Sequence, residues 1–361
     1  MVAILHSSPE SRPRNPSLQP EILPQRSEIG RQEIILPDGQ IRIIPEDGQS
    51  YTVTPLETEI EGMPFRTRLL EPDYPITDRA TLLAYGLGSN SLLHENEASH
   101  FARRGMPVVL HDDPRVKPTR PLNELITDRD ALEEYIRDRL NPLIFASEAL
   151  SIVMDTTRQH DEKYQKFRLK GHSKGGATAM MLAAYEEDIE DVVLDGPVRI
   201  VPGNALWNHA SNLIPMLTDE VIPMAKDLLA NGPKDTRERM VKYFKDDPVR
   251  LGCEIILLIS RNPDAAPLLA EIKSHENEVG IAVVSHQEDR FFRQMAMNKA
   301  VAKLMTMGLV DVYRPLKGTK HVNANINPRG SAEVYESVMG ELAAIRAEKA
   351  LGLGSKVLSL V

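Results

Sequence analysis

The stretch Gly171-His172-Ser173-Lys174-Gly175-Gly176 places a serine between two glycines. It follows the short apolar run FRLKG and precedes the helix-like run TAMMLAAY, which predicts a sharp strand-to-helix turn. A serine hydroxyl is a poor nucleophile unless a base lies nearby and the turn presents it away from its own backbone. Glycines two positions before and after Ser173 relieve crowding in such a turn, and the amide of Lys174 then points at the reaction site. Ser173 is therefore a candidate nucleophile.

The Gly-x-Ser-x-Gly pattern is weak by itself, because roughly 0.1 chance matches are expected in a chain of this length. An ordinary glycine-rich turn is the alternative. The context favours a nucleophile, since the other groups that acyl transfer needs follow in a suitable order along the chain.

A second candidate segment, YGLGSNSLLHENEASHFARRG, begins at Tyr85, where the strand-like run TLLAY ends. Acyl transfer needs amide donors at the developing oxyanion, and a loop after an early strand can supply one. We expect the amides of Leu87 and Lys174 to form this oxyanion hole. The alternative is a phosphate-binding loop, but the segment lacks the third glycine of a dinucleotide fingerprint and the lysine of a P-loop. No cofactor is expected.

Carboxylates end two predicted strands. The stretch VGIAVVSHQEDRFF ends with Glu288 and Asp289 before Arg-Phe-Phe, and VVLDGP contains Asp195. Either strand end could present the acid that orients a histidine. We favour Asp289 because its turn directly follows the strand, whereas Gly196-Pro197 after Asp195 is typical of the entry to an inserted segment. A helix cap or a surface charge is the alternative for each of these carboxylates.

His321 is the candidate base. In PLKGTKHVNANINP it occupies a polar loop between the last predicted strand and the last predicted helix, and no other of the ten histidines has that setting. His172, beside the candidate nucleophile, is interpreted as structural. His111 is followed by two aspartates, but no second histidine lies at ligand spacing, so no metal site is expected.

The elements that must position these residues alternate between strands and helices. Asp38-Gly39 and Asp47-Gly48 separate β-branched runs and predict an antiparallel meander, followed by a strand at 65–70. The later runs TLLAYG, MPVVLH, FRLKG, DVVLDGP, GIAVVSHQED and LVDVYRPLKG are typical of strands buried on both faces. Helices are predicted at 92–104, 128–140, 142–158, from 175 onward, and at 331–349. This alternation predicts an α/β fold with a mainly parallel sheet.

The stretch between Asp195 and Val279 contains no clear strand and is far longer than a plain crossover. Its helical pieces predict a helical cap inserted after the sixth strand. The expected organisation is a flexible N-terminal tail (1–31), a core (32–197 and 279–361) and the cap (198–278). Trp207, Met216 and Met224 of the cap could line a substrate pocket, and packing within the cap is the alternative.

Together these parts resemble the α/β-hydrolase superfamily, in its serine-nucleophile branch of esterases and lipases. The order Ser173, Asp289, His321 matches the family's order of nucleophile, acid and histidine, and YGLGSN resembles its His-Gly-x-Gly oxyanion loop. The resemblance covers about residue 34 to the C-terminus. It implies a serine hydrolase that cleaves an ester or thioester of a small acyl compound through an acyl-enzyme intermediate. An acyltransferase or peptidase on the same triad, or a binding protein that retains the fold, is the alternative.

Four residues depart from the family's pattern. Tyr85 stands where many members have histidine, and Arg168 and Lys170 are unusual for a central strand. Lys174 is less common after the nucleophile than an apolar residue. Its ammonium could recruit an anionic substrate or could simply be solvated.

Composition excludes some other classes of protein. The net charge of −9 and the pI of about 5.7 argue against nucleic-acid binding through a basic surface. The single cysteine, Cys253, excludes an intrachain disulfide and fits a cytoplasmic location. The N-terminal apolar run is too short for a signal peptide, and no apolar run approaches the roughly 20 residues of a membrane helix. Oligomeric state does not follow from these features.

Overall fold

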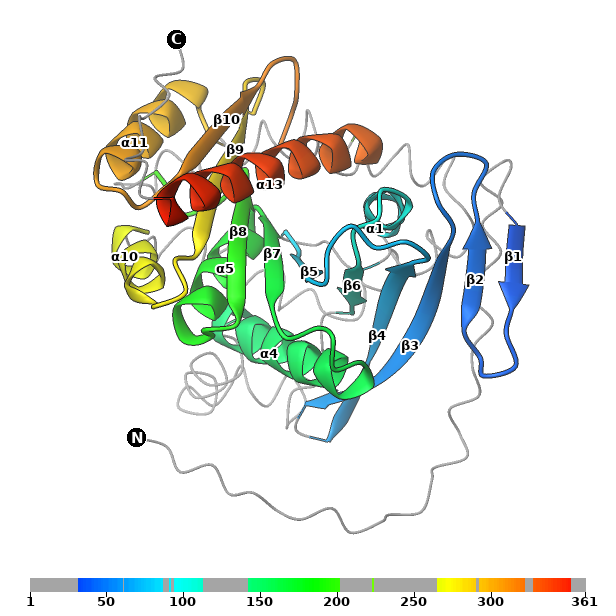
Figure 1. Cartoon of the computed structure of the whole chain (residues 1–361). Coiled ribbons are helices and arrows are strands. Elements are labelled where there is room, and N and C mark those ends of the chain that lie inside the picture. Colours follow the sequence, from blue (N-terminus) through cyan, green and yellow to red (C-terminus); the bar gives the residue numbers. More distant parts are fainter. Residues whose placement is uncertain are drawn as a thin grey trace, which may run out of the picture.

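The computed structural model describes residues 32–60, 62–86, 91, 94–112, 142–201, 223, 265–289, 292–321 and 327–351. In this part of the chain one ten-stranded sheet runs in the order β1-β2-β3-β4-β6-β5-β7-β8-β9-β10 (Figure 1). The strand pairs β1–β2, β2–β3, β3–β4 and β4–β6 are antiparallel. The remaining pairs, β6–β5, β5–β7, β7–β8, β8–β9 and β9–β10, are parallel. The predicted α/β fold, with N-terminal antiparallel strands and a mainly parallel remainder, is confirmed.

The strands and helices have the following bounds. The strands are β1 (Gln32–Ile35), β2 (Ile41–Ile44), β3 (Tyr51–Ile60), β4 (Met63–Pro72), β5 (Ala80–Ala84), β6 (Val108–His111), β7 (Phe167–His172), β8 (Ile189–Asp195), β9 (Gly280–His286) and β10 (Val312–Leu316). The helices are α1 (Glu95–Arg103), α4 (Pro142–His160), α5 (Lys174–Tyr185), α10 (Ala266–Ser274), α11 (Gln294–Thr306) and α13 (Pro328–Ala350).

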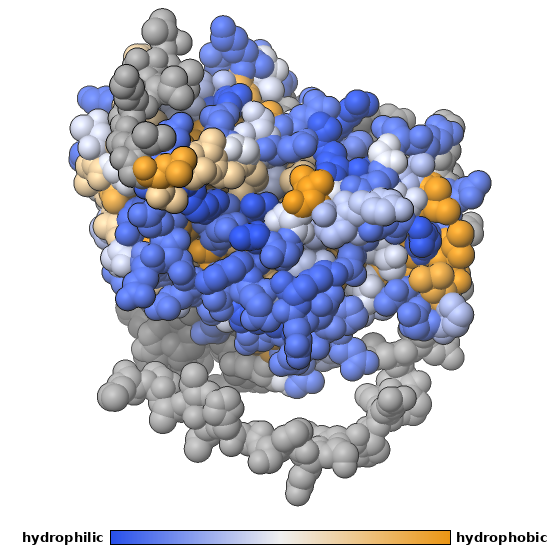
Figure 2. All heavy atoms as spheres, in the orientation of Figure 1, coloured by the Kyte–Doolittle hydropathy of each residue, from blue (hydrophilic) through white to orange (hydrophobic). Residues whose placement is uncertain are grey.

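The N-terminal strands form the predicted meander. Gly39 and Gly48 have φ values of 83° and 76°, the left-handed region that glycine adopts without strain, so both Asp-Gly pairs reverse the chain as expected. At the end of the sheet, β1 leaves Ile34 and Ile35 44% and 69% exposed. Figure 2 shows hydrophobic residues gathered over this end of the molecule, next to a largely hydrophilic face.

Helices cover both faces of the parallel part of the sheet. On one face α4, α5, α10 and α11 enclose the larger hydrophobic core, and on the other α1 and α13 enclose a second core (Figure 1). The strand β5 lies between the two layers and is buried at every residue, which explains its uninterrupted apolar sequence. The carboxyl ends of β5, β7, β8 and β9 therefore meet at one edge of the sheet, where the candidate residues lie.

The stretch 198–278 is only partly described. Its helix α10 packs against α5, and Leu269 and Ile272 belong to the larger core, so α10 is part of the helix layer on that face of the sheet. The strand before this stretch is β8. It is the sixth strand when the count starts at β3 and leaves out the hairpin β1–β2 at the end of the sheet. The expected tail, the expected helix at 128–140 and the rest of the expected cap lie outside the described residues.

Candidate active site

Ser173 occupies the turn between β7 and α5. Its φ and ψ of 54° and −116° are unusual for a residue with a side chain and carry a cost of about 1–3 kcal/mol. Three main-chain hydrogen bonds hold it there: its N–H donates to the oxygen of Asp195 at 3.0 Å, and its own oxygen accepts from Gly176 and Val198 at 3.0 and 3.1 Å. The surrounding structure thus imposes the strained turn that the sequence predicts.

The glycines around Ser173 allow the close approaches that this turn requires. A Cβ at Gly171 would lie 2.4 Å from the oxygen of Gly175, and a Cβ at Gly175 would lie 2.0 Å from the oxygen of Ala84. Both contacts are with main-chain atoms, which cannot swing aside. The first glycine is therefore required by packing within the turn, and the second by packing of the turn against β5.

The structure brings Ser173, His321 and Asp289 together in one hydrogen-bonded chain. The Oγ of Ser173 lies 2.9 Å from Nε2 of His321, and Nδ1 of His321 lies 2.9 Å from Oδ2 of Asp289. A carboxylate can only accept, so Nδ1 carries the proton and Nε2 accepts from the serine hydroxyl. This is the tautomer in which the imidazole can take the proton of Ser173 as a general base.

Asp289 is buried but remains ionised. Burial by itself raises the pKa of a carboxyl, yet the charge and hydrogen bond of His321 and the N–H of Phe292 outweigh it, so the pKa of Asp289 lies below its ordinary value. The amide of Phe292 donates to Oδ1 of Asp289 at 2.9 Å, which leaves Oδ2 for His321. The two oxygens thus have separate partners that fix the orientation of the carboxylate.

The other two carboxylates considered from the sequence do not contact His321. The Oδ1 of Asp195 lies 2.8 Å from Nε2 of His286, and its Oδ2 lies 3.1 Å from Nζ of Lys170. Glu288 is exposed at the turn after β9. Of the three, Asp289 is the one that the structure places against the histidine.

His172 is buried between the nucleophile turn and the loop of His321. Its Nε2 donates to the main-chain oxygen of His321 at 2.8 Å. Burial and the neighbouring His321 lower the pKa of His172 to about 3, so its ring is neutral near pH 7. These contacts agree with the structural interpretation of His172.

Of the two residues expected to form the oxyanion hole, Lys174 lies within the described residues and Leu87 does not. Lys174 is the first residue of α5, and Gly86 lies against the nucleophile turn, since a Cβ on it would lie 3.3 Å from Cβ of Ser173. Leu87 itself lies outside the described residues, as do Trp207, Met216 and Met224. The side chain of Lys174 is buried, which disfavours the alternative that its ammonium is simply solvated.

Reasoning from sequence missed a cluster of buried charges beside these residues, centred on Lys170. The one signal for it was a lysine on a central strand, where a charge needs partners. The Nε2 of His111 lies 3.2 Å from the oxygen of Leu83, and the described residues contain no group of three or more His, Cys, Asp or Glu suited to hold an ion. Within the same residues no helix is both long enough and apolar enough to cross a membrane.

Comparison with known proteins identifies the fold. No family model matches the chain, and no curated protein matches it in sequence. Solved structures do match, among them a bacterial membrane phospholipase A (TM-score 0.53, 16% identity, 81% of this chain and 87% of that one). Others are the enol-lactonase of Burkholderia xenovorans LB400 (0.50, 14%, 78% and 98%) and the proline iminopeptidase of Mycobacterium smegmatis (0.52, 9%, 81% and 100%). The chain has the α/β-hydrolase fold.

Proposed function

We propose that this protein is a serine hydrolase that cleaves an ester or thioester through an acyl-enzyme intermediate. The proposal rests on one observation, the unbroken hydrogen-bonded chain from Ser173 through His321 to Asp289. Such a chain supplies the three things that acyl transfer from serine needs: a nucleophile, a base within reach of its proton, and a carboxylate that orients the base.

In the proposed reaction Ser173 Oγ attacks the carbonyl carbon while Nε2 of His321 takes its proton. The resulting imidazolium is stabilised by Asp289 and then returns the proton to the leaving alcohol or thiol. A water molecule, activated by the same nitrogen, hydrolyses the acyl-serine and restores the enzyme. Proton transfer of this kind contributes about 10²–10⁴-fold to the rate.

We assign the oxyanion hole to the amides of Leu87 and Lys174. The amide of Lys174 begins α5, where the helix dipole favours a developing negative charge. Each such donor is worth about 10²–10³-fold in turnover. Trp207, Met216 and Met224 remain our candidates for the pocket that receives the acyl chain.

The direct test uses a fluorophosphonate probe, which reacts with an activated serine. We expect one labelled site, which peptide mass spectrometry assigns to Ser173, and no labelling of Ser173→Ala, whose circular dichroism spectrum stays that of the wild type. Absence of labelling in the folded wild-type protein would support a binding protein that retains the fold.

A second experiment separates the enzyme classes that share this triad. Turnover of p-nitrophenyl esters and acyl thioesters of increasing chain length is compared with that of aminoacyl-p-nitroanilides, and each ester assay is repeated with an added alcohol acceptor. We expect hydrolysis of the esters or thioesters. Preferred cleavage of the anilides would instead indicate a peptidase, and accumulation of the transferred ester an acyltransferase.

A further inference from the structure

Lys170 is a buried cation on a central strand. It lies on β7, three residues before Ser173, and its side chain is only 4% exposed. A buried ammonium is costly unless its three N–H donors have acceptors and negative charge lies nearby. Lys170 has both, since it forms ion pairs with Glu97 and Asp195, the latter at 3.1 Å, and donates to Oγ of Ser331 at 3.1 Å.

The charges of this cluster stabilise one another. Burial opposes ionisation of all three groups, but Lys170 lowers the pKa of Glu97 to about 2 and that of Asp195 well below its ordinary value. In turn, Glu97 and Asp195 raise the pKa of Lys170 in spite of its burial. At neutral pH the cluster therefore holds one ammonium between two carboxylates.

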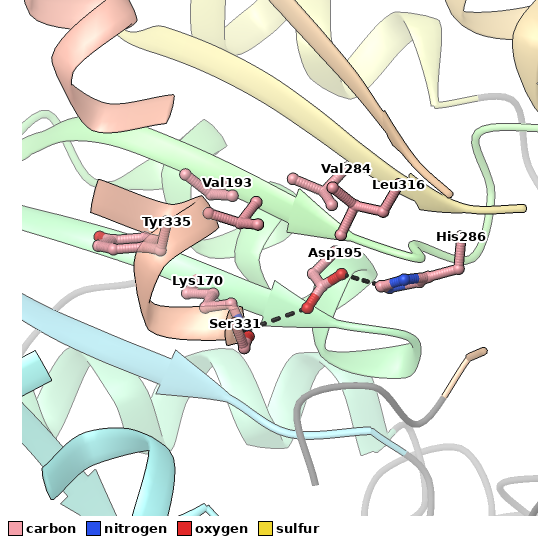
Figure 3. A pocket seen from close by; sticks show the side chains of 9 residues that line it. Lys170, Val193, Asp195, Val284, His286, Leu316, Ser331 and Tyr335 are labelled. Atoms are coloured by element: carbon pink, nitrogen blue, oxygen red, sulfur yellow. Dashed lines mark hydrogen bonds and ion pairs between the residues drawn. The ribbon is translucent and has the colours of Figure 1, made fainter. Parts of the chain in front are cut away.

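From Asp195 the contacts continue toward the candidate triad. Its Oδ1 accepts from Nε2 of His286 at 2.8 Å, and Figure 3 shows the carboxylate lying between Lys170 and His286. Nδ1 of the same ring lies 2.9 Å from the hydroxyl of Thr319, which also donates to the main-chain oxygen of Leu316 at 3.1 Å. His286 ends β9 three residues before Asp289, and Thr319 lies two residues before His321.

Main-chain bonds connect the same two segments. The N–H of Glu288 donates to the oxygen of Thr319 at 2.9 Å, and that of Gln287 donates to the oxygen of Leu316 at 3.0 Å. Two main-chain hydrogen bonds thus attach the turn that carries the acid to the loop that carries the histidine.

The cluster borders a cavity with room for about one water molecule (Figure 3). Lys170, Asp195, His286 and Ser331 line it on one side, and apolar side chains of β8, β9, β10 and α13 line the rest. In such surroundings hydrogen bonds and charges act more strongly than in bulk water.

We propose that Asp195 is a positioning residue for the Asp289–His321 pair, and that it acts through His286 and Thr319. Lys170 holds the carboxylate in place, the carboxylate fixes the ring of His286, and the ring fixes the loop that carries the histidine. A buried ion pair adds little net stability over well-packed apolar residues, so geometric precision is the benefit that explains these charges. An error of about 1 Å in a catalytic group costs on the order of 10²-fold in rate.

This inference rests on the proposed function, and its test starts from wild-type protein that the fluorophosphonate probe labels at Ser173. Thr319→Val removes one hydroxyl at nearly constant volume, so the variant is expected to fold. We expect kcat to fall about tenfold, KM to stay within twofold, and the rate of Ser173 labelling to fall in parallel with kcat. Thr319→Ser, which keeps the hydroxyl, should restore most of the activity. Thr156→Val, which removes a hydroxyl that bonds within α4, is the matched control and should leave kcat unchanged.

A double-mutant cycle tests whether Asp195 and Thr319 act in series. Asp195→Asn should lower kcat about 100-fold. The asparagine amide group would place an N–H donor against the donor of Lys170 or of His286, so one of the two contacts is lost and the ring of His286 is no longer held in place. If the contacts form one chain, adding Thr319→Val to Asp195→Asn should lower kcat less than twofold further. Should Asp195→Asn fail to fold, the Thr319 series still decides the matter.

Two results would overturn the proposal. One is wild-type kcat in Thr319→Val, and the other is a double variant whose loss is the product of the two single losses. A wild-type protein without reactivity at Ser173 would instead defeat the proposed function, before any of these variants is compared.

Discussion

The ring of His172 donates from Nε2 to the main-chain oxygen of His321, and this bond ties the nucleophile turn directly to the histidine loop. The two rings lie with their centroids 5.0 Å apart. The Nδ1 of His172 is buried and has no hydrogen-bond partner among the residues that the structure describes. A second proton on this ring would therefore introduce an uncompensated charge next to the base, which is why burial and His321 lower the pKa of His172 to about 3.

A dependence of stability on pH follows from the lowered pKa of His172. Its ordinary value is near 6.5, so between pH 6.5 and 3 the unfolded chain binds a proton at this residue that the folded chain does not. Stability is complete above pH 6.5 and falls as the pH is lowered, by up to about 1.4 kcal/mol per pH unit for one proton. His172→Gln, which keeps an N–H donor, should remove this contribution.

The measurement is the free energy of unfolding in urea at pH 7 and at pH 5. We expect the loss between the two to be smaller in His172→Gln than in the wild type by about 1–2 kcal/mol. Replacement of His160, which is exposed at the end of α4, serves as the control and should leave the loss unchanged. Equal losses in the wild type and His172→Gln would show that His172 titrates normally.

Asp289→Asn should abolish most activity while the fold is retained. The amide can donate to Nδ1 of His321 and so favour the wrong tautomer, and a comparable change in a serine protease costs about 10⁴-fold in kcat. Glu288→Gln is the matched control, because Glu288 is the exposed neighbour in the same turn. Turnover number is measured for both variants. A loss of less than tenfold in Asp289→Asn would contradict the assignment of the acid.

Gly175→Ala should destabilise the fold strongly. The added methyl group would lie 2.0 Å from the main-chain oxygen of Ala84, so either α5 or β5 must shift. We expect a loss of about 3 kcal/mol or more, seen as a large fall in Tm. Gly340→Ala is the control: its Cβ meets nothing within 4 Å on α13, and alanine favours the helix by about 1 kcal/mol. A Gly175→Ala protein as stable as the wild type would show that the turn and β5 are not in close contact.

Glu97→Gln should destabilise the protein at neutral pH, by about 2–3 kcal/mol, because it removes one of the two carboxylates that pair with Lys170 while Asp195 remains. The pKa of Glu97 is about 2 when folded and about 4.5 when unfolded. The stabilisation is therefore present above pH 4.5 and lost as the pH falls toward 2.

The difference in unfolding free energy between the wild type and Glu97→Gln should shrink between pH 5 and pH 3. Glu57→Gln, on the exposed face of β3, is the comparison that should show no such trend. A constant difference across this range would mean that Glu97 has an ordinary pKa.

The sequence alone was enough for the features that depend on neighbouring residues. The turn around Ser173 follows from a glycine spacing within five residues, the hairpins follow from Asp-Gly pairs, and the buried strands follow from short apolar runs. Each of these signals reflects local sterics or an uninterrupted apolar run, which a single chain displays without its partners. The helices α10 and α11 were missed, although the buried residues Met297, Ala300, Val301 and Leu304 of α11 have helical spacing.

Tertiary structure alone decided which carboxylate contacts His321. Asp195 and Asp289 both follow buried strands that end at the same edge, so the sequence permits either. In the sheet Asp195 is in register with Val284, and its carboxylate therefore lies beside His286 at the end of β9. Asp289 lies in the turn beyond the end of β9, where its carboxylate contacts His321. The partners of Lys170 lie 73, 25 and 161 positions away along the chain, at Glu97, Asp195 and Ser331. Such contacts arise from the register and stacking of distant elements, and no local pattern encodes them.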